Sequence, residues 1–590
     1  MCGILGKFGK NAGLLRDGLV FLKHRGPDAS SEWLSSDGHC WLGHARLAIL
    51  ELSPAGAQPM VSASGRSVIV FNGEIYNHLE VRDRLEGIRW RGHSDTETLL
   101  EAWERLGQSC LALFRGMFAF AIYDLAGGAL HLVRDRLGIK PLYLRREAGL
   151  SFTFASEVRA LLQGNAPTLG NEALACYLAT GHTPVRGELG EGFEILPPGS
   201  VLQITRDGSV SSREWWRLNN PHAHSSGTRQ EVQSAVRFLV ENAVAEHLLS
   251  DVPVAAFLSG GIDSSIVSLV ASRHLGSSLR TFCIGFPNEG FDERATARIV
   301  AERAESLHTE IEVGPGECQQ WVMEAVSAMD LPSADAINTY IVSKAVRQAG
   351  LKVALSGLGG DELFCGYPSF SDIPRLDFLQ KIPPALARAI VRLMPSGVRE
   401  KLDGASSFDP FTLALLRRRW WSERALNSAG VAGAVPWPNT PSKFSDAAQA
   451  ISSAEILGYM EPMLLRDSDQ MSMAVSLELR VPLLDHRLVE FVLSLRQNDK
   501  RGIPPKRLLI DAFADVLPEE VWNRPKQGFA LPMDDWMRGP LKDFCLHGVD
   551  AARRLLNAHF VDVALEKFEA KNLHWTRLWQ IAVLGHTSRK

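Results

Sequence analysis

The 590-residue sequence lacks the patterns that mark several large classes of protein. Its eight cysteines include no CxxC pair, so they indicate neither a disulfide framework nor a structural zinc site. No apolar stretch is long enough to span a bilayer, and the first residues do not form a basic segment followed by an apolar core. The formal net charge of −4 provides no basic surface for nucleic acid. We therefore expect a cytoplasmic protein that binds neither membranes nor nucleic acid.

The length and composition are those of an ordinary globular protein with more than one core. Hydrophobic residues make up 45% of the chain and charged residues 22%, and 590 residues exceed the size of a single compact domain. Short β-type runs separated by turns fill the first part, whereas amphipathic helices dominate later. The polar, turn-rich stretch NNPHAHSSGTRQ lies between them. We expect a first domain over residues 1–215, a linker over 216–230 and a second domain over 231–590.

The second domain has the pattern of a parallel α/β sheet. The apolar segments VPVAAFLSGG, TFCIGF and KVALSGLGG each end in a glycine-containing turn, and helical segments separate them. Strands that alternate with helices predict parallel βαβ units, which bind ligands at the carboxyl ends of the strands. Residues 370–450 carry no motif that we can interpret.

The amino terminus, MCGILGKFG, offers a nucleophile. Removal of Met1 places the α-amino group of Cys2 close to its own thiol. Because an α-amino group has a pKa of roughly 7.7 to 8.0, it can take a proton from the thiol and return it to a leaving amine. Cys2 alone would be weak support, since a cysteine at the second position is usually incidental.

Several motifs downstream of Cys2 occur in an order typical of one kind of domain. They are HRGPD (24–28), GHARL (43–47), GAQP (56–59), FNGEIYNH (71–78) and SDTE (94–97). With the terminal MCGI they resemble the glutaminase domain of class II amidotransferases, an α+β fold of the N-terminal-nucleophile group. The resemblance makes residues 1–215 a glutaminase domain that releases ammonia from glutamine.

The resemblance assigns roles that agree with the chemistry of the residues. Arg46 presents a planar fork to the α-carboxylate of glutamine, and Glu74 and Asp95 bind its α-ammonium group. Asn72 and the backbone N–H of Gly73 form the oxyanion hole beside the catalytic Cys2. Taken singly, Arg46 and Glu74 could instead be surface ion-pair partners, and Asn72-Gly73 an ordinary turn.

The second domain carries a phosphate-binding loop that is not a Walker A loop. AAFLSGGIDSSIVSLVA lacks the GxxxxGK[ST] pattern, but its backbone amides and hydroxyls can contact phosphate oxygens at the start of a helix. SGGxDS resembles the loop of enzymes that split ATP into AMP and pyrophosphate. The same resemblance makes Asp263 and Asp361 ligands of Mg²⁺. The ATP-binding residues that it implies are Leu258, Ser259, Gly260, Gly261, Asp263, Ser264, Ile284, Ser356, Gly357 and Lys506.

With MSMAVSLELRVPLLDHRLVEF (471–491) and RPKQGFALPMDDWMRG (524–539), the resemblance to the asparagine synthetase family covers nearly the whole chain. It implies an α/β ATP-pyrophosphatase domain that activates a carboxylate, normally that of aspartate, as an acyl-adenylate for attack by ammonia. Glutamine, ATP and aspartate are the expected small-molecule partners, and a homodimer is one assembly left open.

Other activities remain open because the sequence departs from the asparagine synthetase pattern at two places. Leu358 stands where these enzymes usually carry glutamate, and LLRDSDQ (464–470) differs from the usual segment that helps to hold aspartate. A sugar acid, a peptide or a secondary metabolite is therefore an alternative acceptor. The intact Cys2 set argues against a β-lactam-forming ligase, and two complete sites argue against an inactive interaction protein.

Overall fold

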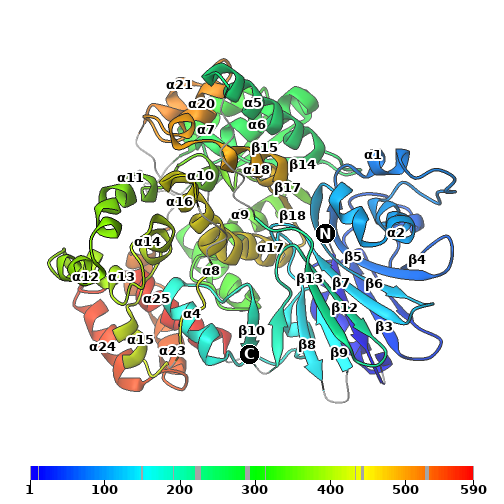
Figure 1. Cartoon of the computed structure of the whole chain (residues 1–590), viewed down its shortest axis with the longest axis horizontal. Coiled ribbons are helices and arrows are strands. Elements are labelled where there is room, and N and C mark those ends of the chain that lie inside the picture. Colours follow the sequence, from blue (N-terminus) through cyan, green and yellow to red (C-terminus); the bar gives the residue numbers. More distant parts are fainter. Residues whose placement is uncertain are drawn as a thin grey trace.

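The computed structural model describes residues 2–10, 12–147, 151–190, 192–218, 227–285, 293–312, 314–431, 433–439, 444–524 and 531–588. Most of the predicted linker, residues 219–226, lies outside these ranges. Figure 1 shows a β-rich amino-terminal half, coloured blue to cyan, beside a largely helical carboxyl-terminal half. None of the described helices is both long enough and apolar enough to cross a membrane.

Two antiparallel sheets form the amino-terminal half. The seven-stranded sheet has the order β10 (Gly187–Gly190), β11 (Phe193–Ile195), β8 (Tyr143–Glu147), β9 (Ser151–Ala155), β1 (Gly3–Phe8), β3 (Cys40–Arg46), β2 (Ala29–Leu34). The six-stranded sheet has the order β13 (Val210–Glu214), β12 (Ser200–Thr205), β7 (Ala129–Arg134), β6 (Gly116–Asp124), β5 (Ser67–Ile75), β4 (Met60–Val61). Helices α1 (His78–Asp83), α2 (Asp95–Leu106), α3 (Val158–Leu161) and α4 (Asn171–Thr180) complete this half.

Strand β5 illustrates how the sequence assigns its side chains to two cores. Val68 and Val70 pack in the core that both sheets contribute to, whereas Ile69 and Phe71 pack in the core that includes residues of α2. This alternation follows the two-residue period of a strand. Both faces of β5 are therefore buried, which holds its carboxyl-terminal end, where the FNGE motif lies, in a fixed position.

The carboxyl-terminal half contains a parallel five-stranded sheet, as the sequence predicts. Its order is β16 (Leu307–Glu312), β15 (Arg280–Gly285), β14 (Val254–Phe257), β17 (Val353–Leu355), β18 (Glu478–Arg480). After β14 the chain adds β15 on one side of it, and later adds β17 on its other side. The carboxyl ends of β14 and β17 therefore flank a topological switch point, where open α/β sheets bind ligands.

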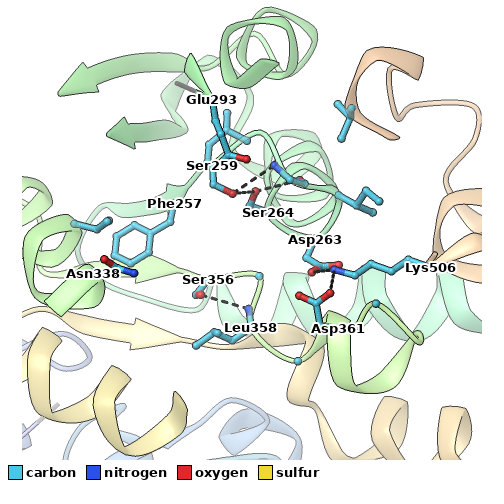
Figure 2. Close-up of a pocket in the computed structure, with 18 of the residues that line it drawn as sticks. Phe257, Ser259, Asp263, Ser264, Glu293, Asn338, Ser356, Leu358, Asp361 and Lys506 are labelled. Carbon is cyan, nitrogen blue, oxygen red and sulfur yellow. Dashed lines mark hydrogen bonds and ion pairs between the residues drawn. The ribbon is translucent and has the colours of Figure 1, made fainter. Parts of the chain in front are cut away.

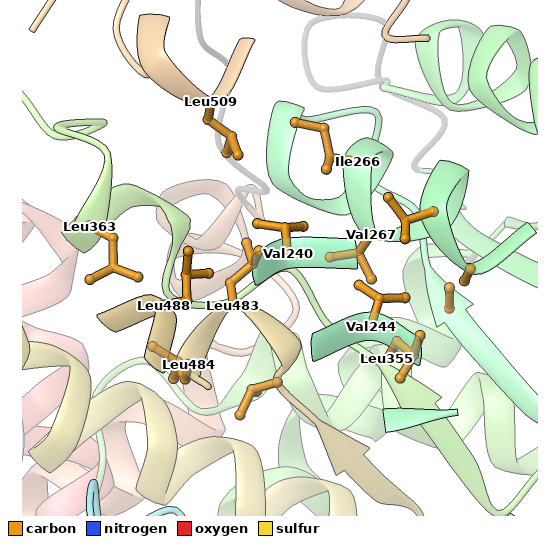
Figure 3. Packing of buried hydrophobic residues seen from close by; sticks show 14 of the residues in the cluster. Val240, Val244, Ile266, Val267, Leu355, Leu363, Leu483, Leu484, Leu488 and Leu509 are labelled. Atoms are coloured by element: carbon orange, nitrogen blue, oxygen red, sulfur yellow. The ribbon is translucent and has the colours of Figure 1, made fainter. Parts of the chain in front are cut away.

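Helix α5 (Arg229–His247) packs against this sheet through a repeating apolar face. Val236, Val240 and Val244 follow one another at four-residue spacing and are buried. Figure 3 shows Val240 and Val244 beside Ile266 and Val267 of α6 (Ile262–Leu275). This packing fixes the start of α6, which carries the SGGxDS loop.

Most of the remaining helices surround the sheet and extend the domain away from it. The first group is α7 (Arg294–Arg303), α8 (Pro315–Ala328), α9 (Ile337–Gln348), α10 (Gly360–Leu363), α11 (Ser369–Asp372), α12 (Pro384–Arg392), α13 (Ser396–Leu402), α14 (Pro410–Arg417), α15 (Glu423–Ser428), α16 (Ala447–Glu455) and α17 (Arg466–Met473). The second is α18 (His486–Ser494), α19 (Gln497–Lys500), α20 (Arg507–Ala512), α21 (Glu519–Trp522), α22 (Met533–Arg538), α23 (Lys542–Ala552), α24 (Ala558–Glu569) and α25 (Trp575–Thr587). Helices α11 to α14 share a separate apolar core with α16, so the uninterpreted 370–450 segment is a helical subdomain.

Candidate active sites

Cys2 lies immediately before β1 in a closed environment. Its exposed fraction is 9%, and burial raises the pKa of its thiol. The thiol points toward the backbone oxygen of Leu47 at 3.9 Å, and the backbone N–H of Cys2 donates to Oδ1 of Asn72 at 3.0 Å. Arg25 of the HRGPD motif donates to the carbonyl of Cys2 at 3.2 Å. These contacts hold the backbone of Cys2, while the raised pKa means that the thiol needs a base to ionise.

Asn72 and Gly73 approach Cys2 from β5. Asn72 is fully buried, and among the described residues its Nδ2 has no hydrogen-bond partner. A Cβ at position 73 would lie 2.1 Å from the backbone oxygen of Met117 on β6, so only glycine allows the two strands this close approach. A buried amide donor without a partner beside a thiol is suited to binding an oxyanion.

Arg46, Glu74 and Asp95 line the same small cavity as Cys2. The Arg46 guanidinium donates to the backbone oxygens of Ser53, at 3.2 Å, and of Glu51. Asp95 begins α2 and accepts the N–H groups of Ile75 at 2.9 Å and of its neighbour in the helix at 2.7 Å. Burial raises the pKa of Asp95 to about 6 and that of Glu74 well above its usual range. The cavity therefore lacks enough positive charge to keep both carboxyls fully ionised.

Arg480 on β18, in the other half of the chain, lies beside Glu74, which lines this cavity. It is fully buried, its Nη2 lies 3.6 Å from Oε1 of Glu74, and its Nε donates to Glu478 at 2.6 Å. Sequence reasoning missed this pair, because LELRVP gives no sign that two of its side chains would meet a carboxylate more than four hundred residues away.

A larger cavity of about 480 Å³ lies at the carboxyl ends of β14, β15 and β17. It is lined by all the predicted ATP-binding residues except Gly260, and by Asp361. Gly260 instead accepts a hydrogen bond at its carbonyl from Arg524, at 3.0 Å. Figure 2 shows Ser259, Ser264 and Asp263 on one side of this cavity and Ser356, Leu358 and Asp361 on the other.

Glycines let the two loops of this cavity approach each other. A Cβ at Gly357 would lie 2.7 Å from the backbone nitrogen of Ser264, and one at Gly360 would lie 2.2 Å from Oδ1 of Asp263. A larger residue at Gly357 or Gly360 would therefore push against the first turn of α6. The contact explains why a glycine-rich turn follows β17 as well as β14.

Lys506 joins the two predicted magnesium ligands. Its ammonium group forms an ion pair with Asp263 and another with Asp361 at 2.8 Å (Figure 2). Burial opposes the charge, but the two carboxylates outweigh it and raise the pKa of Lys506. The residue adopts a φ of +64° just before α20, a conformation that costs a non-glycine residue energy. Three charged side chains from distant segments therefore converge on one point.

The cavity also contains groups that sequence reasoning did not select. Glu293, Asn338 and Tyr367 line it. Burial raises the pKa of Glu293 to about 7. Glu362, four residues after Leu358, also lines the cavity and accepts a hydrogen bond from the Tyr367 hydroxyl at 2.7 Å. No family-like motif surrounds Glu293 or Asn338, so neither could be selected in advance.

Comparison with known sequences agrees with this arrangement of two sites. The sequence model of asparagine synthase matches residues 235–588, and that of a glutamine amidotransferase domain matches residues 1–216. The chain belongs to the asparagine synthase family. It is therefore a glutamine-hydrolysing ligase, and its two halves have the predicted N-terminal-nucleophile and α/β folds. The family uses ATP.

Curated relatives resemble this asparagine synthase family member over most of their length. "Asparagine synthetase [glutamine-hydrolyzing] 1" of Bacillus subtilis (strain 168) is 31% identical, covering 92% of this chain and 89% of its own. "Asparagine synthetase [glutamine-hydrolyzing] 3" of the same organism is 29% identical, covering 90% and 87%. "Amidase chry2" of Gibberella zeae is 28% identical, covering 89% and 86%. The relatives therefore include a protein that is not named for asparagine synthesis.

The segment 464–470, which departs from the usual asparagine synthetase pattern, lies between the two sites. Asp469 forms ion pairs with Arg25, at 2.8 Å, and with Lys140, at 3.2 Å, both in the glutaminase half. Ser468, the preceding residue, lines the synthetase cavity. The unusual sequence of this segment thus coincides with a buried ionic contact between the halves.

Proposed function

We propose that this chain makes asparagine, by transferring ammonia released from glutamine at Cys2 to aspartate that ATP has activated. The observation that carries the proposal is the placement of β18. Leu479 lines the synthetase cavity, whereas Glu478 and Arg480, its neighbours on the strand, belong to the charged cluster beside Glu74. One short strand thus contacts both sites, which supports release of ammonia at one site and its use at the other within the same chain.

At the donor site the Cys2 thiolate attacks the side-chain amide of glutamine. The Asn72 Nδ2 and the Gly73 N–H stabilise the oxyanion that forms, and Arg46 binds the α-carboxylate. Because burial raises the pKa of the thiol, its proton has to pass to a base, and the α-amino group of Cys2, freed by removal of Met1, serves as that base. The same group then protonates the departing ammonia.

At the acceptor site the carboxylate attacks the α-phosphate of ATP and releases pyrophosphate. Asp263 and Asp361 would hold Mg²⁺, because two carboxylates that already converge on one cation offer the hard oxygen ligands this ion prefers. Magnesium supplies positive charge that neutralises the phosphates. Lys506 supplies a second, permanent charge, which stabilises the pyrophosphate as it leaves. Ammonia then displaces AMP from the acyl-adenylate.

Glu362 is our proposed base for the attacking ammonia. Glu362 is buried and lines the synthetase cavity, so its carboxylate can take the proton that the attacking ammonia loses. The hydrogen bond from Tyr367 fixes its orientation. Glu362 would then take over a function that Leu358 cannot perform.

Amidation of a longer carboxylic acid is the second candidate function. It is favoured by Leu358, which gives the synthetase cavity an apolar side chain where a charged group would contact the ammonium group of aspartate. Both candidates share the same donor chemistry and the same acyl-adenylate.

The proposal is tested by incubating the purified chain with glutamine, ATP, Mg²⁺ and aspartate and measuring AMP, pyrophosphate and asparagine. We expect the three products in equal amounts. In Asp361→Asn the aspartate-dependent exchange of pyrophosphate into ATP should fall about 100-fold, while glutamine hydrolysis changes less than about twofold. Asp377→Asn, at a partly exposed residue that does not line the cavity, is the control. Exchange at the normal rate in Asp361→Asn would exclude this cavity as the adenylation site.

A further inference from the structure

A second cavity, of about 270 Å³, lies directly beside the synthetase cavity. Its lining includes Tyr367, Lys401, Arg417, Arg418 and Trp420. Tyr367 also lines the synthetase cavity, so the two cavities meet at this residue. Lys401 and Arg417 come from α13 and α14, in the helical subdomain of residues 370–450.

The charges around this second cavity do not balance. Arg418 pairs with Glu455 at 2.7 Å, and Arg417 pairs with Asp372 at 2.8 Å. Lys401 donates to the backbone oxygen of Arg417 at 2.6 Å, but over the described ranges no carboxylate lies within ion-pair distance of it. The two arginines are thus compensated, and the lysine contributes one net positive charge.

The surroundings of Lys401 favour an incoming anion. Burial and the charges of Arg417, Arg418 and Arg577 lower the pKa of its ammonium group. Glu400, the carboxylate next to Lys401 in the chain, pairs with Arg577 at 3.3 Å. A half-buried ammonium group among other cations is stabilised most by a negative ligand that enters the cavity.

Arg418 also holds Tyr367 in position where the two cavities meet. Its guanidinium lies 4.4 Å from the centre of the Tyr367 ring and 3.6 Å from that of Tyr459. On the other side of Tyr367, its hydroxyl contacts Glu362. The tyrosine is therefore fixed at both ends, and a ligand that spans the two cavities would lie along it.

We propose that the second cavity binds the far anionic group of a longer acceptor, so that the chain amidates, besides aspartate, a dicarboxylic acid longer than aspartate. Its reacting carboxylate lies at the ATP site, its apolar middle lies along Leu358 and Tyr367, and its second carboxylate pairs with Lys401. Aspartate has only two carbon atoms between its carboxyl groups, too few to pass a tyrosine side chain. The inference rests on the proposed amidation chemistry and names the substrate class of its second candidate.

The test uses acid-dependent exchange of labelled pyrophosphate into ATP, which does not need the glutaminase site. Azelate is the probe, its monomethyl ester is the matched acid with one charge removed, and aspartate is the third acid. We expect kcat/KM to be about tenfold higher for azelate than for the ester, the usual size of a contact with a charged group.

Lys401→Met removes the charge while keeping most of the side chain. It should raise KM for azelate about tenfold and leave kcat, KM for the ester and KM for ATP unchanged. Lys381→Met, an exposed lysine of the same subdomain, is the control and should change none of these values. Glutamine hydrolysis reports that each variant is folded.

Equal use of azelate and its ester, or no effect of Lys401→Met, would overturn the inference. Exchange with aspartate alone would also overturn it, and would leave the proposed asparagine synthesis standing. No exchange with any of the three acids, in protein that still hydrolyses glutamine, would contradict the proposed function itself.

Discussion

The two active sites of this chain are built in opposite ways. The donor cavity is small, and four residues that line it, Cys2, Arg46, Gly73 and Asp95, lie within the first hundred positions on one β-sandwich. The acceptor cavity is large, and three of its charged residues, Asp263, Asp361 and Lys506, come from segments far apart in the sequence. A closed site made of short-range elements holds one substrate, whereas an open site assembled from loops can change its acceptor by changing one loop.

The two sites also differ in how well their buried charges are balanced. At the donor site the carboxyls of Glu74 and Asp95 have raised pKa values because burial is not offset by enough positive charge. At the acceptor site Lys506 lies between two carboxylates and stays charged. The donor site gains full complementarity only with the ammonium group of its substrate. The acceptor site is already balanced and awaits a metal and phosphates.

The largest expected effect would separate the two sites completely. Cys2→Ala should lower glutamine hydrolysis by about 10⁴-fold or more, because the nucleophile is lost. Ammonium salts should still support amide synthesis at a rate within about twofold of the unaltered chain. Cys545→Ala, a buried cysteine in the carboxyl-terminal half, is the control and should affect neither activity. Residual glutaminase activity in Cys2→Ala would end the assignment of Cys2.

A smaller effect would test whether the donor site stabilises a developing charge. Asn72→Ala should lower kcat for glutamine hydrolysis by about 10²- to 10³-fold with little change in KM, because the missing donor acts only on the oxyanion. Asn77→Ala is matched, since Asn77 lies nearby but bonds to the backbone of Leu113 and Arg115. That control should lose stability and keep its kcat. A rise in KM alone would make Asn72 a substrate-binding residue.

Much of the fold was predictable because its signals are local. The strand-glycine segments around Val254 and Val353 gave the parallel sheet, since apolar runs that end in glycine depend on few distant contacts. The function of the helical subdomain of residues 370–450 could not be predicted, because neither its apolar core nor its basic residues belong to a recognisable motif. The subdomain is connected to the acceptor site through Tyr367, which lines both cavities.

The donor site was easier to predict than the acceptor site for a physical reason. Its residues were found at one cavity because neighbouring strands bring their ends together. The contribution of Arg480 could not be predicted, because it depends on how the two halves dock. Similarly, Asp469 looked like part of an acceptor-binding segment, but it pairs with Arg25 across the interface between the halves.

A pH titration would test the electrostatic side of the comparison. The pKa of Asp95 is raised to about 6 by burial, so this carboxyl is ionised above pH 6 and becomes protonated as the pH falls through that value. Binding of glutamine to Cys2→Ala, measured by calorimetry, should therefore weaken about tenfold between pH 7 and pH 5. Asp95→Asn should bind weakly at both pH values. Affinity that does not change with pH would show that Asp95 is not the partner of the ammonium group.

The smallest expected effect concerns Leu358, an apolar residue of the acceptor cavity. Leu358 is half-buried at the cavity wall, so Leu358→Glu should fold and lose only about 1 kcal/mol of the free energy of unfolding. The new carboxylate can bind the ammonium group of aspartate, but it shares the cavity with Asp361 and Glu362, whose negative charge favours its protonated form. We therefore expect kcat/KM for aspartate to rise only about threefold.

Leu358→Gln is the control, because glutamine has the shape of glutamate without its charge. It should give no rise in kcat/KM for aspartate. Both variants should use azelate less well than the unaltered chain, because a polar group then lies along the apolar middle of the acceptor. The measurement is pyrophosphate exchange with each acid at pH 7, with chemical unfolding as the check on stability. Efficient use of aspartate by the unaltered chain at low concentration would contradict the role given to Leu358. The cavity wall would then tolerate leucine because Glu362 alone supplies the base that the reaction needs.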